Sequence, residues 1–259
     1  MNERERSDLT SEAPFHDHFS RVSSAYAAFR PGYPPSLFLH LAALAPRRRT
    51  AWDCATGSGQ AAQGLAEHFE TVWATDASPA QLAAALPHPR IHYRVARAEA
   101  SGLEAGSIDL LTVAQAVHWF DLQQFYAEAR RVLAPRGVLA VWCYDLMEID
   151  PAIDALVFTF YKETVGPYWP PERSLVESHY ETLEFPFEPV LVPPFNMEAQ
   201  LDLNELAGYV RTWSAVGRYR EVHGTDPVLP FLEVLEPRWG PAETRRTVRW
   251  PLAVRVGRV

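Results

Sequence analysis

The sequence predicts an α/β protein with a doubly wound, mostly parallel sheet that is covered by helices on both faces. Three observations support this fold class. Strand-like and helical segments alternate up to about residue 145. Two of the predicted strands, 108–113 and 138–144, are largely apolar, which is typical of strands buried on both faces. The first strand also leads through a glycine-rich turn into a helix, as in open α/β sheets.

Apolar and β-branched residues define the strands, and apolar residues at helical spacing define the helices. A helix at 36–44 is expected to be capped by Ser36 and closed by Pro46. The predicted strands are 50–54, 71–75, 91–95, 108–113 and 138–144, and the further helices are 60–69, 79–86 and 122–133.

The regularity decreases beyond residue 145. Helices are predicted at 151–165 and 203–214, with a proline-rich stretch between them, and a closing strand at 246–256, in which Pro251 requires an edge or a bulge. We therefore expect a flexible N-terminus at 1–14, a cofactor-binding core at 15–145, and at 146–259 an acceptor-side helical and aromatic cap plus the closing strands of the same sheet.

The composition excludes several classes of protein. The chain has 259 residues, is 47% apolar and 22% charged, and carries a formal charge of −8, so we expect a globular protein without the basic stripe of a nucleic-acid binder. The longest apolar run is too short to span a membrane, and the charged N-terminus is unlike a signal peptide. Cys54 and Cys143 are expected to be buried free thiols. These features predict a cytoplasmic protein.

The segment Asp53-Cys54-Ala55-Thr56-Gly57-Ser58-Gly59-Gln60 joins the first strand to the next helix. Glycines there allow a ligand to approach the backbone closely. Asp76 ends the second strand, where a carboxylate accepts hydrogen bonds from two ribose hydroxyls. The combination predicts a cofactor that contains a nucleoside.

Two cofactors fit this turn. Gly57-x-Gly59-x-x-Ala62 matches the dinucleotide fingerprint, so an NAD(P)-dependent oxidoreductase is one alternative. However, the Asp53 carboxylate disfavours a pyrophosphate and favours a cationic group, such as an amine or a sulfonium. The Tyr-x-x-x-Lys pair of short-chain reductases is also absent, since Phe158 stands four residues before Lys162, the only lysine. The cationic cofactor is therefore preferred.

Five segments resemble the motifs of class I S-adenosylmethionine-dependent methyltransferases, in the small-molecule type 11 group that includes trans-aconitate methyltransferase-like proteins. Residues 53–59 resemble the first motif, D/E-x-G-x-G-x-G, with Ala55 in place of glycine. Residues 76–78, 97–100 and 115–120 are similar to the ribose-binding strand end, the adenine loop and the segment after strand four. Residues 130–137 resemble the turn before strand five, with Arg136 where glycine is common.

The resemblance implies a Rossmann-like, seven-stranded sheet with an antiparallel last strand, and S-adenosylmethionine as the cofactor. Asp53 and the turn residues would bind its methionyl part, Asp76 and Ala77 its ribose, and the loop after strand three its adenine. The full set of expected cofactor-binding residues is Asp53, Ala55, Thr56, Gly57, Gly59, Asp76, Ala77, Ala98, Glu99, Gln115 and Ala116.

Further residues are candidates for the acceptor side. His118 is a candidate general base, although a positioning or packing role beside Trp119 is the preferred interpretation. Aromatic residues of the second half, among them Tyr144, predict an apolar acceptor pocket. Arg211 and Arg218 either bind an acidic acceptor or lie on a solvated face. Three residues are expected either to form a lid or to dock the leading helix: Tyr26, Arg30 and Tyr33.

The predicted activity is methyl transfer by in-line displacement to an oxygen or nitrogen of a small molecule, with an organic acid suggested by family analogy. A non-catalytic cofactor-binding protein stays an alternative. A nucleic-acid methyltransferase is disfavoured because Gln115-Ala116-Val117-His118 stands where an Asn/Asp-Pro-Pro-Tyr segment would lie. The pair His16 and His18 has no further ligand cluster, so no metal site is predicted. We expect a monomer or a homodimer.

Overall fold

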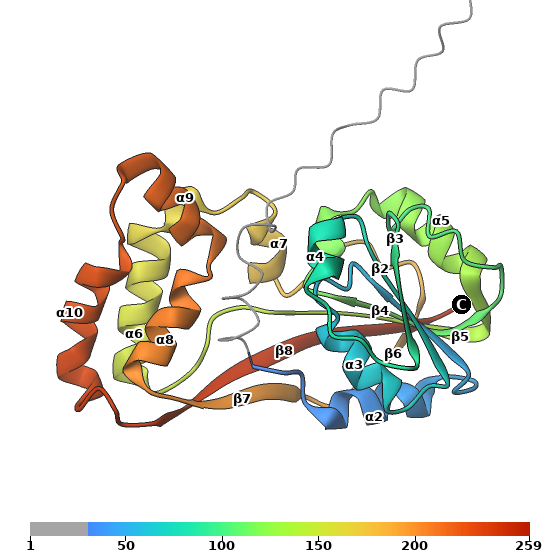
Figure 1. The fold of residues 1–259 in the computed structure, drawn as a ribbon, viewed down its shortest axis with the longest axis horizontal. Coiled ribbons are helices and arrows are strands. Elements are labelled where there is room, and N and C mark those ends of the chain that lie inside the picture. The colour runs from blue at the N-terminus through green and yellow to red at the C-terminus, as the bar shows by residue number, and fades with distance from the viewer. Residues whose placement is uncertain (1–30) are drawn as a thin grey trace, which may run out of the picture.

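A computed structural model describes residues 31–259, and its centre is a mixed sheet (Figure 1). Seven strands lie on one path in the order β3-β2-β1-β4-β5-β8-β6. Strands β1 to β5 are parallel, whereas β8 pairs antiparallel with β5 and β6. The bounds are β1 Thr50–Cys54, β2 Thr71–Asp76, β3 Ile91–Val95, β4 Ile108–Ala114, β5 Leu133–Tyr144, β6 Glu188–Val190 and β8 Arg246–Arg258.

The predicted fold class is confirmed, including the antiparallel last strand. Two strands have no counterpart among the predicted strand ranges: β6 and an eighth strand, β7 (Phe195–Leu201), which pairs with the first half of β8. Pro251 pairs with Asn196 of β7, and it lies just outside the part of β8 that pairs with β5, which begins at Leu252. The proline therefore avoids a position between two neighbouring strands.

Both faces of the sheet are buried, as the apolar runs indicate. Successive residues of β5 alternate between two apolar clusters: Val138, Ala140 and Trp142 belong to one cluster, and Leu139 and Val141 to the other. Helices α2 (Pro35–Leu44) and α3 (Gln60–Ala66) pack into the first cluster, and α5 (Leu122–Val132) packs into the second. The short helix α4 (Pro79–Ala83) lies against β2 and β3.

A second group of helices stands beside the sheet, and the long strands β7 and β8 extend from the sheet toward it (Figure 1). Aspartates begin two of these helices: the side chain of Asp150 accepts backbone hydrogen bonds at the start of α6, and Asp202 forms a capping box with Glu205 in α8. The elements are α6 Pro151–Thr159, the π-helical turn η2 Phe160–Thr164, the 3₁₀ turn η3 Gly166–Tyr168, α7 Arg173–Glu177, α8 Leu203–Arg211, α9 Ser214–His223 and α10 Val228–Trp239.

Several element boundaries differ from those predicted. Ser36 does not cap α2, because Pro35 already occupies the first helical turn, where its fixed φ and missing N–H fit a helix start. Helices α3 and α4 end three residues early, and the predicted helix 203–214 is divided between α8 and α9. The division of the chain at residues 14 and 145 stays a prediction, and the N-terminal segment 1–14 lies outside the described residues.

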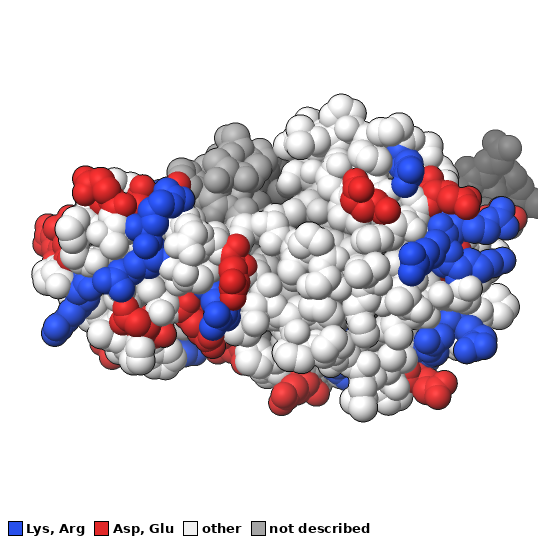
Figure 2. Space-filling view, turned by 90° about the horizontal axis from the view of Figure 1, so that it is seen from below, with Lys and Arg blue, Asp and Glu red and all other residues white. Residues whose placement is uncertain are grey.

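On the face that Figure 2 shows, basic side chains form a band at one end and a group at the other, with acidic side chains beside them. Basic and acidic side chains gather toward the two ends of this face, and its middle has few charges. Among the described residues, no helix is long and apolar enough to cross a membrane. Cys54 and Cys143 are buried and unpaired, as expected.

Arg136 occupies a conformation that normally favours glycine. Its φ is +64°, in the turn that leads into the central part of β5. A left-handed conformation costs an L-residue about 1–2 kcal/mol. The departure from the family's glycine at this position therefore stores local strain.

We expect Arg136→Gly to raise the free energy of unfolding by about 1 kcal/mol, because glycine adopts this φ without a steric penalty. Chemical denaturation of both proteins measures the difference. Arg136→Ala removes the same exposed side chain but keeps a Cβ, so it is expected to give no such gain. An equal gain in both variants would assign the effect to the lost arginine side chain.

Candidate functional site

Parallel pairing places the sequence-predicted site residues at one edge of the sheet. Because β1 to β4 run in the same direction, the segments that follow them leave from their shared carboxyl edge. These segments are the turn 55–59 after β1, Asp76 at the end of β2, residues 97–99 after β3 and residues 115–119 after β4. The order β2-β1-β4 makes the edge between β1 and β4 a topological switch point, where open α/β sheets bind ligands.

The glycine turn after β1 has three residues with positive φ: Ala55 (+54°), Gly57 (+57°) and Gly59 (+86°). The N–H of Thr56 donates to the carbonyl of Thr75 at 2.9 Å, so the turn is tied to β2. Ala55 therefore stands at a second position where a left-handed backbone explains the family's preference for glycine. The turn keeps its form with alanine there, at the cost of local strain.

Asp76 fastens the other side of the turn. Its Oδ2 accepts a hydrogen bond from the N–H of Gly57 at 2.8 Å, and its Oδ1 accepts one from the N–H of Ser78 at 2.9 Å. The residue and its neighbour Ala77 are half-buried. A carboxylate at the end of the second strand is the type of group that accepts hydrogen bonds from ribose hydroxyls.

Asp53 lies beneath the turn and is 1% exposed. Its oxygens accept hydrogen bonds from the hydroxyls of Thr56 at 2.5 Å and Thr112 at 2.8 Å, which links the turn and β1 to β4. Burial raises the pKa of Asp53 to about 6, against the lowering effect of these hydrogen bonds. The carboxylate is thus a buried anchor of the turn, and Thr112 is a partner that the sequence analysis missed because a threonine within an apolar strand carries no functional signal.

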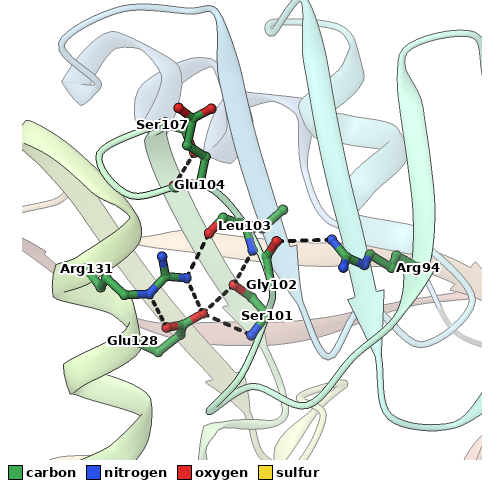
Figure 3. A network of polar contacts seen from close by, with 8 residues as sticks. All are labelled: Arg94, Ser101, Gly102, Leu103, Glu104, Ser107, Glu128 and Arg131. Atoms are coloured by element: carbon green, nitrogen blue, oxygen red, sulfur yellow. Dashed lines mark hydrogen bonds and ion pairs between the residues drawn. The ribbon is translucent and has the colours of Figure 1, made fainter.

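The loop after β3 is fixed to helix α5 by a buried acid (Figure 3). Glu128, which is 8% exposed, accepts hydrogen bonds from the backbone N–H of Ser101 at 2.9 Å and from its hydroxyl at 2.5 Å. Arg131 holds Glu128 at 2.7 Å and also donates to the carbonyl of Leu103 at 2.8 Å. The hydrogen bonds from Arg131 and Ser101 keep the pKa of Glu128 low. This network fixes the position of the loop that carries Ala98 and Glu99.

Within that loop, Glu99 and Ala98 differ in their surroundings. Glu99 pairs with Arg97 at 3.4 Å and accepts a hydrogen bond from the N–H of Asp121 at 3.1 Å. Ala98 is buried and belongs to the same apolar cluster as Ala116, which follows β4. An apolar surface and a carboxylate therefore lie at neighbouring points of the sheet edge.

The segment after β4 carries Gln115 and His118. Gln115 has a positive φ of +56°, and its side chain donates to the carbonyl of Tyr144 at 2.9 Å, so it joins the ends of β4 and β5. His118 lies in a 3₁₀ turn, η1 (Val117–Trp119), and its Nδ1 is 2.7 Å from the hydroxyl of Tyr180. Burial lowers the pKa of His118 to about 4, so the imidazole is neutral at physiological pH.

A cationic group approaches this edge from the helical segments. Arg173, whose side chain is 18% exposed, forms an ion pair with Asp145, directly after β5, and donates through Nε to the hydroxyl of Tyr161 at 2.6 Å. Its guanidinium lies 4.7 Å from the ring centre of Trp169. The sequence did not single out Arg173, since it is one arginine among many and its partners are distant in the chain.

The other acceptor-side candidates differ in their positions. Arg211 pairs with Asp226 at 2.8 Å, and Arg218 donates to the carbonyl of Tyr168 at 3.3 Å. Tyr33 packs against Trp142, with ring centres 5.3 Å apart. Tyr144 is buried at the end of β5, and Trp119 packs against His118. Four residues named above lie outside the described part of the chain: His16, His18, Tyr26 and Arg30.

Comparisons with known proteins agree with this geometry. Residues 52–141 match a family model described as a methyltransferase domain. A Dictyostelium discoideum protein described as a methyltransferase is 35% identical over 231 residues, which cover 88% of each chain. A solved structure from Anaeromyxobacter dehalogenans, described as a type II methyltransferase, is 47% identical with a TM-score of 0.85, covering 89% of this chain and 98% of that one.

The fold and the comparisons together define an enzyme class. The chain belongs to the class I S-adenosylmethionine-dependent methyltransferases, with S-adenosylmethionine as its cofactor. The residues present fit that molecule: Gly57 has no side chain and only Gln81 near the position of a Cβ, Asp76 places a carboxylate at the end of β2, and Ala98 and Ala116 provide apolar surface. Among residues 31–259, no group of three or more histidine, cysteine or acidic side chains is arranged to hold a metal ion.

We expect Ser101→Ala to lower the free energy of unfolding by about 1–3 kcal/mol, because the buried Glu128 loses a hydrogen-bond donor. Urea denaturation measures this loss. Ser107→Ala is a matched control, since the Ser107 hydroxyl donates only to the exposed loop carbonyl of Glu104, and its effect is expected to stay within about 0.5 kcal/mol. Equal effects in the two variants would contradict the anchoring role of Glu128.

Asp53 gives a prediction for the dependence of stability on pH. The folded-state pKa of about 6 lies above the ordinary 3.8, so the folded protein binds more protons than the unfolded chain between these values. The ionised carboxylate therefore destabilises the fold increasingly as the pH rises from about 4 to about 6. We expect the stability gained by Asp53→Asn to be about 2 kcal/mol larger at pH 7.5 than at pH 4.

Asp226→Asn is the control of opposite sign. Although burial opposes it, hydrogen bonds from Arg211 and Arg220 hold the pKa of Asp226 below its usual value. Its replacement is expected to cost stability at pH 7.5 and less in acid. Denaturant titrations across the pH range in which the variants fold measure both trends, and a gain from Asp53→Asn that does not vary with pH would refute the first.

Proposed function

We propose that this enzyme transfers a methyl group to an oxygen of a small organic acid. The observation that carries the proposal is the position of Arg173, a mostly buried cation that lies beside the carboxyl ends of β4 and β5 while the cofactor-type residues lie at the ends of β1, β2 and β3. A guanidinium is suited to attract a carboxylate, and Nη1 of Arg173 donates to none of the described residues. The trans-aconitate-like subtype and the place of the acceptor rest on this argument and on family analogy.

In this proposal different residues of the chain bind different parts of S-adenosylmethionine. Asp53, Ala55, Thr56, Gly57 and Gly59 form the surface for the methionyl part. The remaining cofactor contacts are Asp76 and Ala77 at the ribose, Ala98 and Glu99 at the adenine, and Gln115 and Ala116 near the transferred group.

S-Adenosylmethionine supplies a methyl group on a sulfonium, which leaves as a neutral thioether. The residues at the sheet edge then act by aligning the acceptor oxygen with that carbon and by excluding water. Tyr144, Trp119 and the aromatic side chains near Arg173 would provide the apolar part of the acceptor site. Tyr33 stays a candidate lid residue.

Several broader features support a small-molecule acceptor. The net charge of −8 disfavours a nucleic-acid substrate. An NAD(P)-dependent oxidoreductase is not favoured by the relatives. A monomer or homodimer and a cytoplasmic location belong to the same proposal.

Calorimetric titration with S-adenosylhomocysteine, run beside NADH, tests the cofactor site. We expect S-adenosylhomocysteine alone to bind, with a dissociation constant in the micromolar range or tighter (about −8 kcal/mol). Methyl transfer to a panel of small carboxylic acids, followed as S-adenosylhomocysteine release, tests the acceptor class. If amines alone, or nucleic acids alone, were methylated, the proposed acceptor class would be wrong.

We expect Asp76→Ala to weaken S-adenosylhomocysteine binding by tenfold or more, because hydrogen bonds to a charged group contribute about 1.5–3 kcal/mol each. Titration calorimetry measures the change. Asp76→Asn keeps the shape and is expected to give a smaller loss. Glu67→Ala removes an exposed charge at the other end of α3 and is the control, expected to bind normally. Unchanged affinity in both Asp76 variants would remove Asp76 from the site.

A further inference from the structure

The pair formed by His118 and Tyr180 determines what the histidine is able to do. Nδ1 of His118 is 2.7 Å from the hydroxyl of Tyr180, which is 0% exposed. No other hydrogen bond of either side chain joins it to the described residues. The backbone near Tyr180 is fixed as well, since Arg255 donates to the carbonyls of Tyr180 and Leu183.

The buried hydroxyl decides the direction of this hydrogen bond. If Nδ1 carried the proton and donated it, the phenolic hydrogen of Tyr180 would be buried with no acceptor among residues 31–259. An unsatisfied buried donor costs about 1–3 kcal/mol. The hydroxyl of Tyr180 is therefore the donor and Nδ1 the acceptor. A neutral imidazole whose Nδ1 accepts must carry its single proton on Nε2.

The charged and titratable surroundings keep the imidazole in this form. Burial and the positive charge of Arg173 both lower the pKa of His118. Burial raises the pKa of the Tyr180 hydroxyl, so this group keeps its proton. Cys143 of β5, Asp145 after it and Tyr161 beside Arg173 are further titratable groups of this neighbourhood, and burial raises the pKa of the Cys143 thiol to about 12.

A buried hydrogen-bond donor without a partner among the described residues lies near Arg173. The indole Nε1 of Trp169 is buried and has no hydrogen-bond partner among the described residues, and its ring packs against the Arg173 guanidinium. Arg173 itself uses Nε for Tyr161 and Nη2 for Asp145, while its Nη1 donates to none of the described residues. His118 and Arg173 thus have N–H groups without a partner among residues 31–259 near the ends of β4 and β5, and the buried indole of Trp169 packs against Arg173.

We propose that His118 is a hydrogen-bond donor through Nε2–H and not a general base, and that the acceptor oxygen is already an anion when it enters the site. This inference rests on the proposed function and specifies how the site treats the acceptor. The anionic oxygen forms a bond to the methyl carbon, the carbon–sulfur bond breaks, and its electron pair returns to sulfur. No proton is transferred, so the site requires no base. His118 is a positioning residue that acts together with Tyr180.

Nitrogen-15 NMR of the full-length protein tests the tautomer without any acceptor. The signals of His118, one of nine histidines, are assigned by comparison with His118→Gln. We expect Nε2 to show the shift of a protonated nitrogen, Nδ1 that of an unprotonated one, and neither to titrate between pH 8 and pH 5. A proton on Nδ1, or titration near pH 6.5, would overturn the proposal.

Tyr180→Phe removes only the hydroxyl that selects the tautomer. In this variant we expect signals of both tautomers and titration at a higher pH than in the wild type. If the variant does not fold, the wild-type spectrum still decides the question. A Tyr180→Phe spectrum identical to that of the wild type would show that the hydroxyl does not set the tautomer.

Kinetics test the consequence for chemistry. Phenylacetate, hexanoate and succinate are compared with 2-phenylethanol and 1-hexanol as methyl acceptors. We expect turnover with acids only and a kcat that does not change between pH 6 and pH 8.5. His118→Gln keeps a hydrogen-bond donor in place of Nε2–H, so we expect its kcat to stay within tenfold of the wild type. His118→Leu has no such donor, and we expect a larger loss of kcat. Alcohol methylation with a pH profile that disappears in His118→Gln would identify a base and overturn the inference.

The two proposals fail in different ways. If none of these acids were methylated but the NMR result stood, the proposed acceptor class would be wrong while the tautomer of His118 would hold. If acids were methylated but Nδ1 carried the proton, the function would stand and the assigned role of His118 would fall. Trp169→Phe, which removes the indole N–H and keeps one six-membered aromatic ring, should raise the acceptor KM several-fold with an unchanged KM for S-adenosylmethionine.

Discussion

The shared direction of the five parallel strands is the constraint on which the site depends. Parallel pairing puts the ends of β1 to β5 at one edge, so residues as distant in sequence as Asp76 and His118 belong to one face of the molecule. Asp53 then links two of these strands, because Thr56 and Thr112 donate to the same carboxylate. The glycine turn is held between this buried acid on one side and Asp76 on the other.

The buried acid illustrates a conflict between stability and function. Burial raises the pKa of Asp53, so its ionised carboxylate destabilises the folded state at neutral pH. The same negative charge beneath the turn suits a cofactor that carries an amine and a sulfonium. Ala55 and Arg136 add backbone strain, because both have a positive φ. The free-energy cost of the turns beside the sheet is therefore shared by several residues.

The helical segments beside the sheet contribute through a few long-range contacts. Arg173 of α7 joins Asp145, at the end of β5, to Tyr161 in the π-helical turn. Such turns are frequent at functional sites, because the extra residue changes the direction of a side chain. Tyr180, which follows α7, reaches His118 after β4. The surroundings of His118 at the carboxyl edge of the sheet are thus set in part by residues about 60 positions further along the chain.

The sequence by itself determined the sheet, the order of its elements and the positions of the turn and Asp76. Local patterns suffice for these features, since apolar periodicity, glycine and a carboxylate at a strand end act within a few residues. It did not determine β6 and β7, which lie in and just after a proline-rich stretch, although β7 alternates apolar and polar residues. Nor did it determine the true start of α2, where a proline replaces the expected serine cap. The tertiary structure alone decided that Thr112 supports Asp53, that Glu128 anchors the loop after β3, and that Tyr180 and Arg173 surround His118. These contacts join segments far apart in the chain, and the pKa of a buried group depends on that three-dimensional environment, which no local pattern contains.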